Sequence, residues 1–289
     1  MSSRSDVVAA MVAPMTDVDD ATMRRLLLHE ARVHAIPGRD LRDLGDAILL
    51  HDPIEREPFW NRLEGLRWPE DPAAFDRRLT ETLVLFASIG RTPHIWATPI
   101  HDSPGDLVAR LESNGFRDMG MGNVMMLVDP KPARQSTTQP PPDGVTVERL
   151  AGVEGSDAEA ASSAIVDVLI DAFEVDPERR PAIEGETVAS LSHPWFTHYL
   201  VRADGEPASV ARRATFEGVT YLSSIGTAGW ARGRGLGTLV TRMAASEGLA
   251  DGSAFVYLGV FADNSDAIGV YERSGFEKVG SSCPDMLLW

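Results

Sequence analysis

The stretch from Arg232 to Gly237 combines residue types and spacing that suit ligand chemistry. It runs Arg-Gly-Arg-Gly-Leu-Gly, between a strand predicted at 221–227 and a helix predicted from Leu236 to about Leu249. The N-terminus of a helix presents unpaired backbone N–H groups and the positive end of the helix dipole. Glycine lets the backbone come close to a ligand, and arginine adds positive charge. The stretch therefore favours the binding of an anion, most often a phosphate.

Two common phosphate-binding motifs do not fit this loop. A dinucleotide-binding loop has the spacing G-x-G-x-x-G, whereas the glycines here are spaced G-x-G-x-G. The strands before the loop are joined by short turns at 204–205 and 217–218, which makes them antiparallel, and a Rossmann unit needs parallel strands. A P-loop contains a lysine, and this stretch has none. A purely structural glycine turn remains as an alternative, but it does not need two arginines.

Residues after the loop extend the pattern. Asn264 follows the next predicted strand, and Tyr271 leads into a helix end at Gly275-Phe276. Loop, asparagine, tyrosine and Gly-Phe pair, in this order and at these separations, resemble the GNAT superfamily of acyl-CoA-dependent N-acyltransferases. The resemblance covers roughly Val145 to Trp289. It implies acetyl-CoA or another acyl-CoA as co-substrate, and it implies no metal.

The resemblance also implies where acetyl-CoA binds. Backbone N–H groups of the loop would hold the pyrophosphate, and the exposed edge of the strand before it would pair with the pantetheine arm. An N–H of that strand would stabilise the oxyanion. Asn264 would hydrogen-bond the pantetheine arm or a bridging water, although it could instead cap the helix that starts at Ala267. The implied binding residues are Ile225, Gly226, Thr227, Arg232, Gly233, Arg234, Gly235, Leu236, Gly237, Thr238 and Asn264.

Tyr271 matches the position of the family's general acid, which protonates the CoA sulfur. The reaction needs a free amine to attack and a thiolate to leave. A phenol with an ordinary pKa near 10 is protonated at neutral pH and can supply the proton. The alternative is that Tyr271 is only a core residue of an amphipathic helix.

The general base is less well defined. Many family members place a carboxylate on the strand before the loop, but the residues at 221–225 include none. Glu174, at the end of a predicted helix, lies where the family often forms the acceptor site, so it is our catalytic candidate. His193 and His198 are further candidates, and a chain of water molecules could also remove the proton.

The two halves of the chain show a weak internal repeat. Residues 111–116 align with 271–276, and the same offset places Trp96 on Val256. We expect an α+β fold with two tandem GNAT-like domains, each a mixed, mostly antiparallel sheet flanked by helices. The tandem layout is similar to that of the mycothiol synthase family, an architectural likeness from which no substrate is taken. The expected limits are a degenerate domain at 1–128, a proline-rich linker at 129–144 and a catalytic domain at 145–289.

The first half lacks the loop, the asparagine and the tyrosine. We therefore expect it not to bind CoA, but to pack on the second half and shape the acceptor cleft. A helix capped by Thr16-Asp17 should open this half. Each half should end in a hairpin, one after Phe116 and the other after Phe276.

Composition excludes several classes of protein. A net charge of −16 argues against nucleic acid or an anionic membrane as the main partner. No apolar run approaches the ~18 residues that span a bilayer. The run at 7–13 is too short, and too close to acidic residues, for us to expect a secretion signal. Cys283 is the single cysteine, which excludes an intramolecular disulfide and favours a reducing, cytoplasmic location.

These observations lead us to expect an enzyme that moves an acetyl group from acetyl-CoA to a primary amine by direct attack. Two alternatives stay open. One is a non-catalytic acyl-CoA-binding or regulatory module, which the missing strand carboxylate favours. The other is a protein N-terminal or lysine acetyltransferase, so the acceptor is either a small-molecule amine or a peptide amine.

Overall fold

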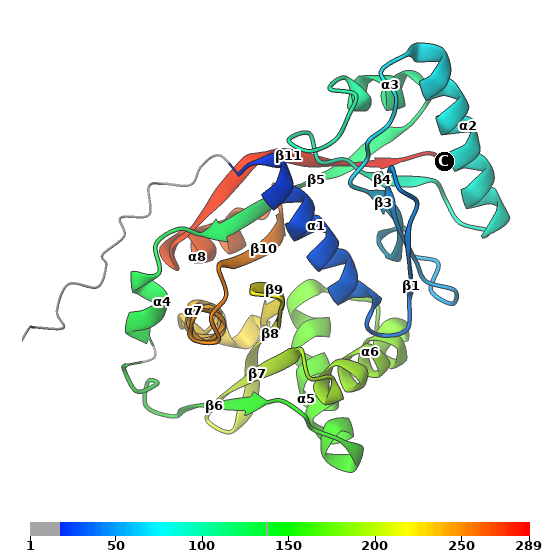
Figure 1. Ribbon diagram of the computed structural model, residues 1–289. Helices are drawn as coiled ribbons and strands as arrows, with labels where there is room; N and C mark the ends of the chain where they lie inside the picture. Colours follow the sequence, from blue (N-terminus) through cyan, green and yellow to red (C-terminus); the bar gives the residue numbers. More distant parts are fainter. Residues whose placement is uncertain (1–17, 137) are drawn as a thin grey trace, which may run out of the picture.

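The computed structural model describes residues 18–136 and 138–289. The fold is α+β, as predicted, and is built on one mixed sheet of eleven strands with helices packed on both faces (Figure 1). The apolar run at 7–13 and the cap expected at Thr16-Asp17 lie outside the described residues. The first described helix is capped by Asp19, whose carboxylate accepts a hydrogen bond of 2.8 Å from the backbone N–H of Thr22.

The first half begins with a helix that covers the sheet and ends with a long strand and a short helix. Its elements are α1 (Asp20–Ala35), β1 (Asp40–Asp43), β2 (Ile48–His51), η1 (Pro58–Trp60), β3 (Asn61–Glu64), α2 (Pro72–Ser88), β4 (His94–Trp96), α3 (Leu107–Ser113), β5 (Arg117–Leu127) and α4 (Lys131–Ser136).

The second half follows the order of elements expected from its sequence except at its end. Its elements are β6 (Val145–Leu150), α5 (Gly155–Phe173), η2 (Pro177–Arg179), α6 (Arg180–Ser192), β7 (Phe196–Ala203), β8 (Glu206–Phe216), β9 (Val219–Thr227), η3 (Gly229–Ala231), α7 (Leu236–Ala250), β10 (Phe255–Phe261), α8 (Ser265–Arg273) and β11 (Phe276–Leu287).

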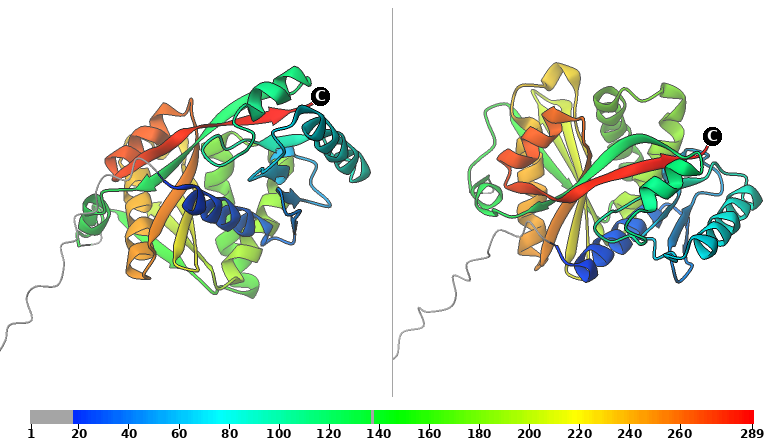
Figure 2. Two further views of the ribbon diagram at one scale, coloured as in Figure 1. Left: turned by 45° about the horizontal axis from the view of Figure 1, so that its top comes forward. Right: turned by 90° about the horizontal axis from the view of Figure 1, so that it is seen from above.

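The last strand of each half is exchanged with the other half. In the strand order β1-β2-β3-β4-β11-β5-β10-β9-β8-β7-β6, β5 lies between β11 and β10, and β11 lies between β4 and β5. The hairpins expected after Phe116 and Phe276 are therefore wrong, because each segment is one long strand (Figure 2). A hairpin pairs a strand with its own continuation. Here both neighbours of each strand come from the other half, so neither strand folds back.

The strand order agrees with an internal repeat. β3 and β4 form a parallel pair, as do β9 and β10; two antiparallel strands extend the first pair and three extend the second. α2 precedes β4 as α7 precedes β10, and α3 follows β4 as α8 follows β10. Because one continuous sheet joins the halves, the domain limits at 1–128 and 145–289 remain a prediction.

The segment expected as a linker, 129–144, is only partly extended. It contains α4, and Ala133 of this helix is fully buried in the same core cluster as Val240 and Ala244 of α7. Pro132 lies in the first turn, where its missing N–H breaks no helical hydrogen bond. Through Ala133, this proline-rich segment packs on the second half.

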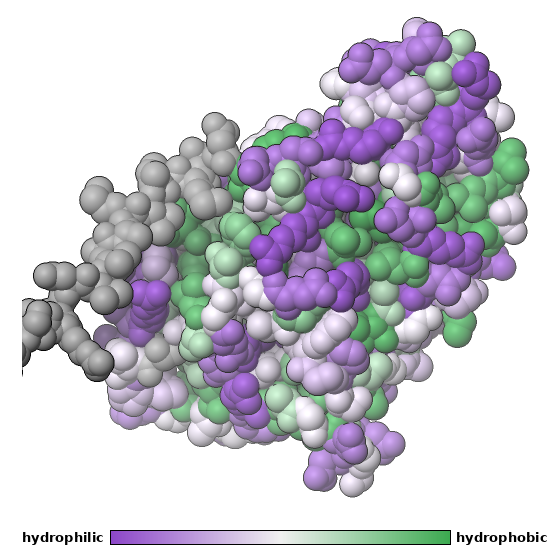
Figure 3. All heavy atoms as spheres, in the orientation of Figure 1, coloured by the Kyte–Doolittle hydropathy of each residue, from purple (hydrophilic) through white to green (hydrophobic). Residues whose placement is uncertain are grey.

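Two cores lie on opposite faces of the sheet, because successive strand residues point to opposite sides. On one face Leu222 of β9 and Leu258 of β10 pack against α7. On the other face Tyr221 and Tyr257 of the same strands pack against α1. The first half therefore supplies the helix that covers β9 and β10. Figure 3 shows hydrophilic residues over the outer side of α1, as expected for an amphipathic helix.

Candidate active site

The loop before α7 presents an open helix N-terminus. Gly233 has a φ of +76° and Gly235, the N-cap residue, has a φ of +77°, a left-handed conformation that favours glycine. No side chain in the described part of the chain caps α7. A Cβ placed at either glycine would meet no heavy atom within 4 Å, so a ligand can approach this backbone closely. These features are those of an anion site.

The equivalent helix of the first half is closed. Asp71 is the N-cap of α2, and its carboxylate accepts a hydrogen bond of 2.8 Å from the backbone N–H of Ala74. Pro72 follows in the first turn and has no N–H to offer. A carboxylate at this position occupies the donors and repels a phosphate.

A cavity of about 660 Å³ opens beside the α7 N-terminus. Of the predicted site residues, all but Arg234 line it. The Arg234 guanidinium lies instead 3.6 Å from the carboxylate of Asp204 and over the ring of Trp230. The predicted residues that line the cavity are Glu174, Ile225, Gly226, Thr227, Arg232, Gly233, Gly235, Leu236, Gly237, Thr238, Asn264 and Tyr271.

β9 and β10 separate next to this cavity. They pair in parallel up to Leu222 and Leu258, after which β9 runs on to Thr227 and β10 runs on beside β5. At the point of separation Ser224 has a φ of +50° and the register between β8 and β9 shifts, which marks a β-bulge. A non-glycine residue in this conformation is strained, and such strain is concentrated at functional sites. The gap between β9 and β10 corresponds to the strand edge predicted for pantetheine.

Tyr271 is buried on the α7 face of the sheet and also lines the cavity. Burial raises the pKa of Tyr271 to about 12, so the phenol is protonated over the physiological range. Its ring packs edge-on against Phe276, with 6.3 Å between the ring centroids. Tyr271 is therefore a core residue and a lining residue of the cavity at the same time.

Comparison with known proteins agrees with this geometry. Residues 163–276 match the model of the acetyltransferase (GNAT) family. This part of the chain is a GNAT domain. A mycothiol acetyltransferase from Streptomyces avermitilis is 29% identical over an alignment of 201 residues that covers 66% of this chain. The chain spans about 60% of the length of the curated relatives it matches.

Solved structures share the fold. A GCN5-related N-acetyltransferase from Kribbella flavida superposes with a TM-score of 0.64 at 24% identity, over 90% of this chain and 94% of that one. A tandem GNAT protein from the clavulanic acid biosynthesis pathway superposes with a TM-score of 0.59 at 16% identity, over 89% of this chain and 86% of that one. The whole described chain is therefore GNAT-like in fold, including its tandem form.

Asn264 of the GNAT domain caps a helix. Its side-chain oxygen accepts a hydrogen bond of 3.1 Å from the backbone N–H of Ala267, so it is the N-cap of α8. The alternative role considered from the sequence is thus observed. The residue also lines the cavity, and its amide nitrogen is free of that capping bond. A contact with the pantetheine arm therefore stays a prediction.

The three candidate bases of the GNAT domain lie in different surroundings. Glu174 ends α5 with a φ of +52°, is exposed and lines the cavity. His198 is buried, contacts the hydroxyl of Ser190 at 2.8 Å and lies outside the cavity. Burial lowers the pKa of His198 to about 3. His193 packs against the ring of Trp195 and is also outside the cavity. Only Glu174 of these three reaches the site.

Sequence reasoning missed several residues that line the cavity. Arg273 adds a second cation to the cavity lining. The first is Arg232, whose guanidinium donates hydrogen bonds to the backbone oxygens of Thr227 (3.3 Å) and Ala172 (3.0 Å). Residues 267, 270 and 271 are spaced so that they share one face of α8, and this spacing could have predicted that α8 forms one side of the cavity. The other lining residues not predicted are Ala172, Phe173, Ala231, Asp266, Ala267 and Val270.

The described residues include neither a group of metal-ion ligands nor a membrane-spanning helix. Between residues 18 and 289, Thr137 apart, no three His, Cys, Asp or Glu side chains are grouped to hold a metal ion. No helix in the same part of the chain is long and apolar enough to cross a membrane.

Proposed function

We propose that the chain is an N-acetyltransferase that moves an acetyl group from acetyl-CoA to a primary amine by direct attack. The observation that carries this proposal is one cavity that joins an uncapped helix N-terminus, a strand gap and a buried, protonated Tyr271. Each of these features suits one part of an acyl-CoA. Together they give the order phosphate, pantetheine and thioester along the cavity.

The residues present fit acetyl-CoA. The N–H groups of the first turn of α7 would receive the pyrophosphate, and Arg232 and Arg273 would add positive charge at the same cavity. The edge of β9 at 225–227 would pair with the pantetheine amides. An N–H at the bulge would stabilise the oxyanion that forms when the carbonyl carbon is attacked.

Tyr271 would protonate the departing sulfur. Because its pKa is raised to about 12, the phenol keeps its proton until a thiolate develops next to it. Glu174, which is exposed and lines the cavity, would hold the ammonium of the incoming acceptor. These roles follow from position and chemistry, and mutagenesis tests them.

The acceptor in this proposal is a small-molecule amine. Support comes from similarity to proteins named mycothiol acetyltransferase, a name that refers to a small molecule and not to a protein. A peptide amine is the second candidate. A non-catalytic acyl-CoA-binding module is disfavoured by the placement of a protonated phenol at the cavity, since binding alone does not need it.

Thiol release from acetyl-CoA tests the proposal. The full chain is incubated with glucosamine, cysteine ethyl ester, putrescine or tyramine, and free CoA is read with a thiol reagent. We expect at least one amine to raise the rate above that of hydrolysis. Tight binding of acetyl-CoA by calorimetry, with no acceleration by any amine or peptide, would support the non-catalytic module. Acceleration by peptides alone would support a protein acetyltransferase.

A further inference from the structure

β9 has no carboxylate of its own, but one reaches it from the first half. The hydroxyl of Tyr221 donates a hydrogen bond of 3.3 Å to Oε1 of Glu30 on α1. We propose that these two residues form the pair that takes the proton from the acceptor amine. Tyr221 is the catalytic residue that touches the amine, and Glu30 is the positioning carboxylate behind it. The inference rests on the proposed acetyl transfer.

Tyr221 lies where the two strands separate. It pairs with Tyr257 in register, one position before the last pair, Leu222 and Leu258. The next residue of β10 is Gly259, and a Cβ built on it would lie 3.6 Å from the Tyr221 hydroxyl. Gly259 is exposed. The phenol oxygen therefore stands beside a strand position that has no side chain and is open to solvent.

Tyr221 and Tyr271 lie on opposite faces of the sheet. Tyr271 belongs to the core on the α7 side, whereas Tyr221 belongs to the core on the α1 side. A thioester held between β9 and β10 would have one phenol on each side. The leaving sulfur would face Tyr271, and an amine arriving from the other face would meet Tyr221. This arrangement separates the two proton transfers in space.

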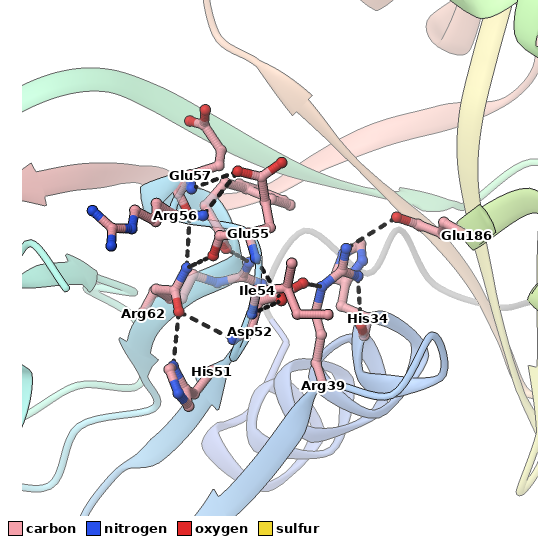
Figure 4. A network of polar contacts seen from close by, with 12 residues as sticks. His34, Arg39, His51, Asp52, Ile54, Glu55, Arg56, Glu57, Arg62 and Glu186 are labelled. Carbon is pink, nitrogen blue, oxygen red and sulfur yellow. Dashed lines mark hydrogen bonds and ion pairs between the residues drawn. The ribbon is translucent and has the colours of Figure 1, made fainter. Parts of the chain in front are cut away.

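Glu30 is held in place by the first half. Oε1 of Glu30 lies 3.8 Å from the guanidinium of Arg62, a fully buried residue of β3. The end of α1 is fixed by Arg39, which donates to Asp52 at 2.8 Å and to Glu186 of α6 at 3.1 Å (Figure 4). Glu186 accepts a further bond of 3.0 Å from a β8 arginine. This network ties α1 to the second half and fixes the distance from Glu30 to β9.

The charges around Glu30 suit a proton acceptor. Burial raises the pKa of Glu30 above its usual range, and the Arg62 cation opposes this. Burial and the nearby carboxylate raise the pKa of Tyr221 well above its usual value. The resting phenol therefore stays protonated and donates a hydrogen bond to Glu30. The Glu30 side chain is 16% exposed, which leaves it a solvent path. The titratable groups that face it are Tyr221, Tyr257, Arg62, Glu64, His34 and Cys283.

The proton transfers balance as follows. One N–H proton of the ammonium passes to the Tyr221 oxygen as the Tyr221 proton passes to Glu30. The nitrogen lone pair then forms the C–N bond, the C–S bond breaks, and the sulfur takes the Tyr271 proton. The second N–H proton restores the Tyr271 phenol. Glu30 returns its proton to solvent, so the products are the amide, the free thiol of CoA and one proton.

The test compares two carboxylates that share one arginine. Glu30→Gln removes the carboxylate that accepts the hydrogen bond of Tyr221. Glu64→Gln removes the other carboxylate of Arg62, which lies 2.9 Å from its guanidinium and forms no hydrogen bond with Tyr221. Turnover of acetyl-CoA with the best amine of glucosamine, cysteine ethyl ester, putrescine and tyramine is measured from pH 6.5 to 9.5. Acetyl-CoA affinity is measured by calorimetry as a control of the fold.

We expect Glu30→Gln to lower kcat by about 100-fold near neutral pH. The deficit should shrink as pH rises toward the pKa of the amine, since free amine then needs no base. Tyr221→Phe should lower kcat with the same pH dependence as Glu30→Gln. Glu30→Asp should be faster than Glu30→Gln, because it keeps a carboxylate. The affinity for acetyl-CoA should be unchanged in all three variants. Glu64→Gln should change the rate by the same factor at every pH.

Other results would overturn the assignment. An active wild type with an unaffected Glu30→Gln variant would reject Glu30 and leave the proposed acetyl transfer standing. A pH-independent deficit equal to that of Glu64→Gln would show that the carboxylate is only structural. A wild type that acetylates none of the four amines would contradict the proposed function, and this inference would fall with it.

Discussion

Asp71 and Gly235 occupy the same position, the N-cap, in the two equivalent helices α2 and α7, but only Asp71 fills it with a side chain. The Asp71 carboxylate binds a backbone N–H of its own helix. Gly235 leaves the corresponding donors facing a cavity. This single difference would explain why the repeated fold has the proposed phosphate site in its second half and not in its first.

Gly235→Asp should abolish binding of acetyl-CoA. The carboxylate would cap α7 as Asp71 caps α2, and it would repel the pyrophosphate. The left-handed φ would add strain, so the control must carry the same strain. Gly252→Asp provides it, because Gly252 has a φ of +85° and open space around it at the other end of α7. Calorimetry should show lost affinity for the first variant and unchanged affinity for the second. Equal affinities would reject the pyrophosphate site.

Asp71→Ala should affect stability and not ligand binding. Loss of an N-cap carboxylate typically costs ~1 kcal/mol, so urea denaturation should show a free energy of unfolding lower by about that amount. Calorimetry should still give one acetyl-CoA per chain. A second acetyl-CoA bound by this variant would contradict the assignment of the chemistry to the second half.

Tyr271→Phe should lower kcat by about 100-fold with little change in acetyl-CoA affinity, because it removes the proton donor and keeps the ring. Tyr199→Phe is a matched control, since Tyr199 is buried in the same core cluster and does not line the cavity. Thiol release with an acceptor amine measures both variants. If Tyr271→Phe turns over like the wild type, another group protonates the sulfur.

The loop and the tyrosine could be predicted because each depends on a short stretch of sequence. Alternating glycine and arginine at a strand–helix junction predicts an anion site, and all the glycines of that loop line the cavity. Which arginine of the loop faces the cavity depends on the backbone conformation of the loop, and the sequence does not reveal that conformation. Arg234 therefore points away from the cavity, toward Asp204.

The features that the sequence did not predict depend on contacts between residues far apart in the chain. Gly-Phe predicts the end of a helix, but not that the strand after it pairs with the other half. The contact of Tyr221 with Glu30 joins residues 191 positions apart, and no local pattern connects them. A search for the base on β9 itself could not find a carboxylate that comes from α1.

The stability of the chain should fall as the pH drops below about 6.5, the ordinary pKa of histidine. Burial lowers the pKa of His198 to about 3 and that of His29 to about 4, so the folded state keeps both neutral while the unfolded state binds protons. Stability is thus complete above the unfolded pKa and is lost as pH falls toward the folded values. In this pH range each histidine lowers the free energy of unfolding by up to ~1.4 kcal/mol for each unit by which the pH falls.

His198→Gln isolates one of these contributions. Its free energy of unfolding, measured in urea between pH 6.5 and 5, should change less steeply with pH than that of the wild type. A slope identical to that of the wild type would mean that His198 is already protonated in the folded protein.

The transfer of label from acetyl-labelled acetyl-CoA to an amine tests the central claim most directly. The full chain is supplied with the labelled donor and the amine that best accelerates thiol release, and labelled amide and free CoA are quantified together. We predict one labelled N-acetyl product for each CoA released. Release of CoA with no labelled amide, the outcome of simple hydrolysis, would contradict the account.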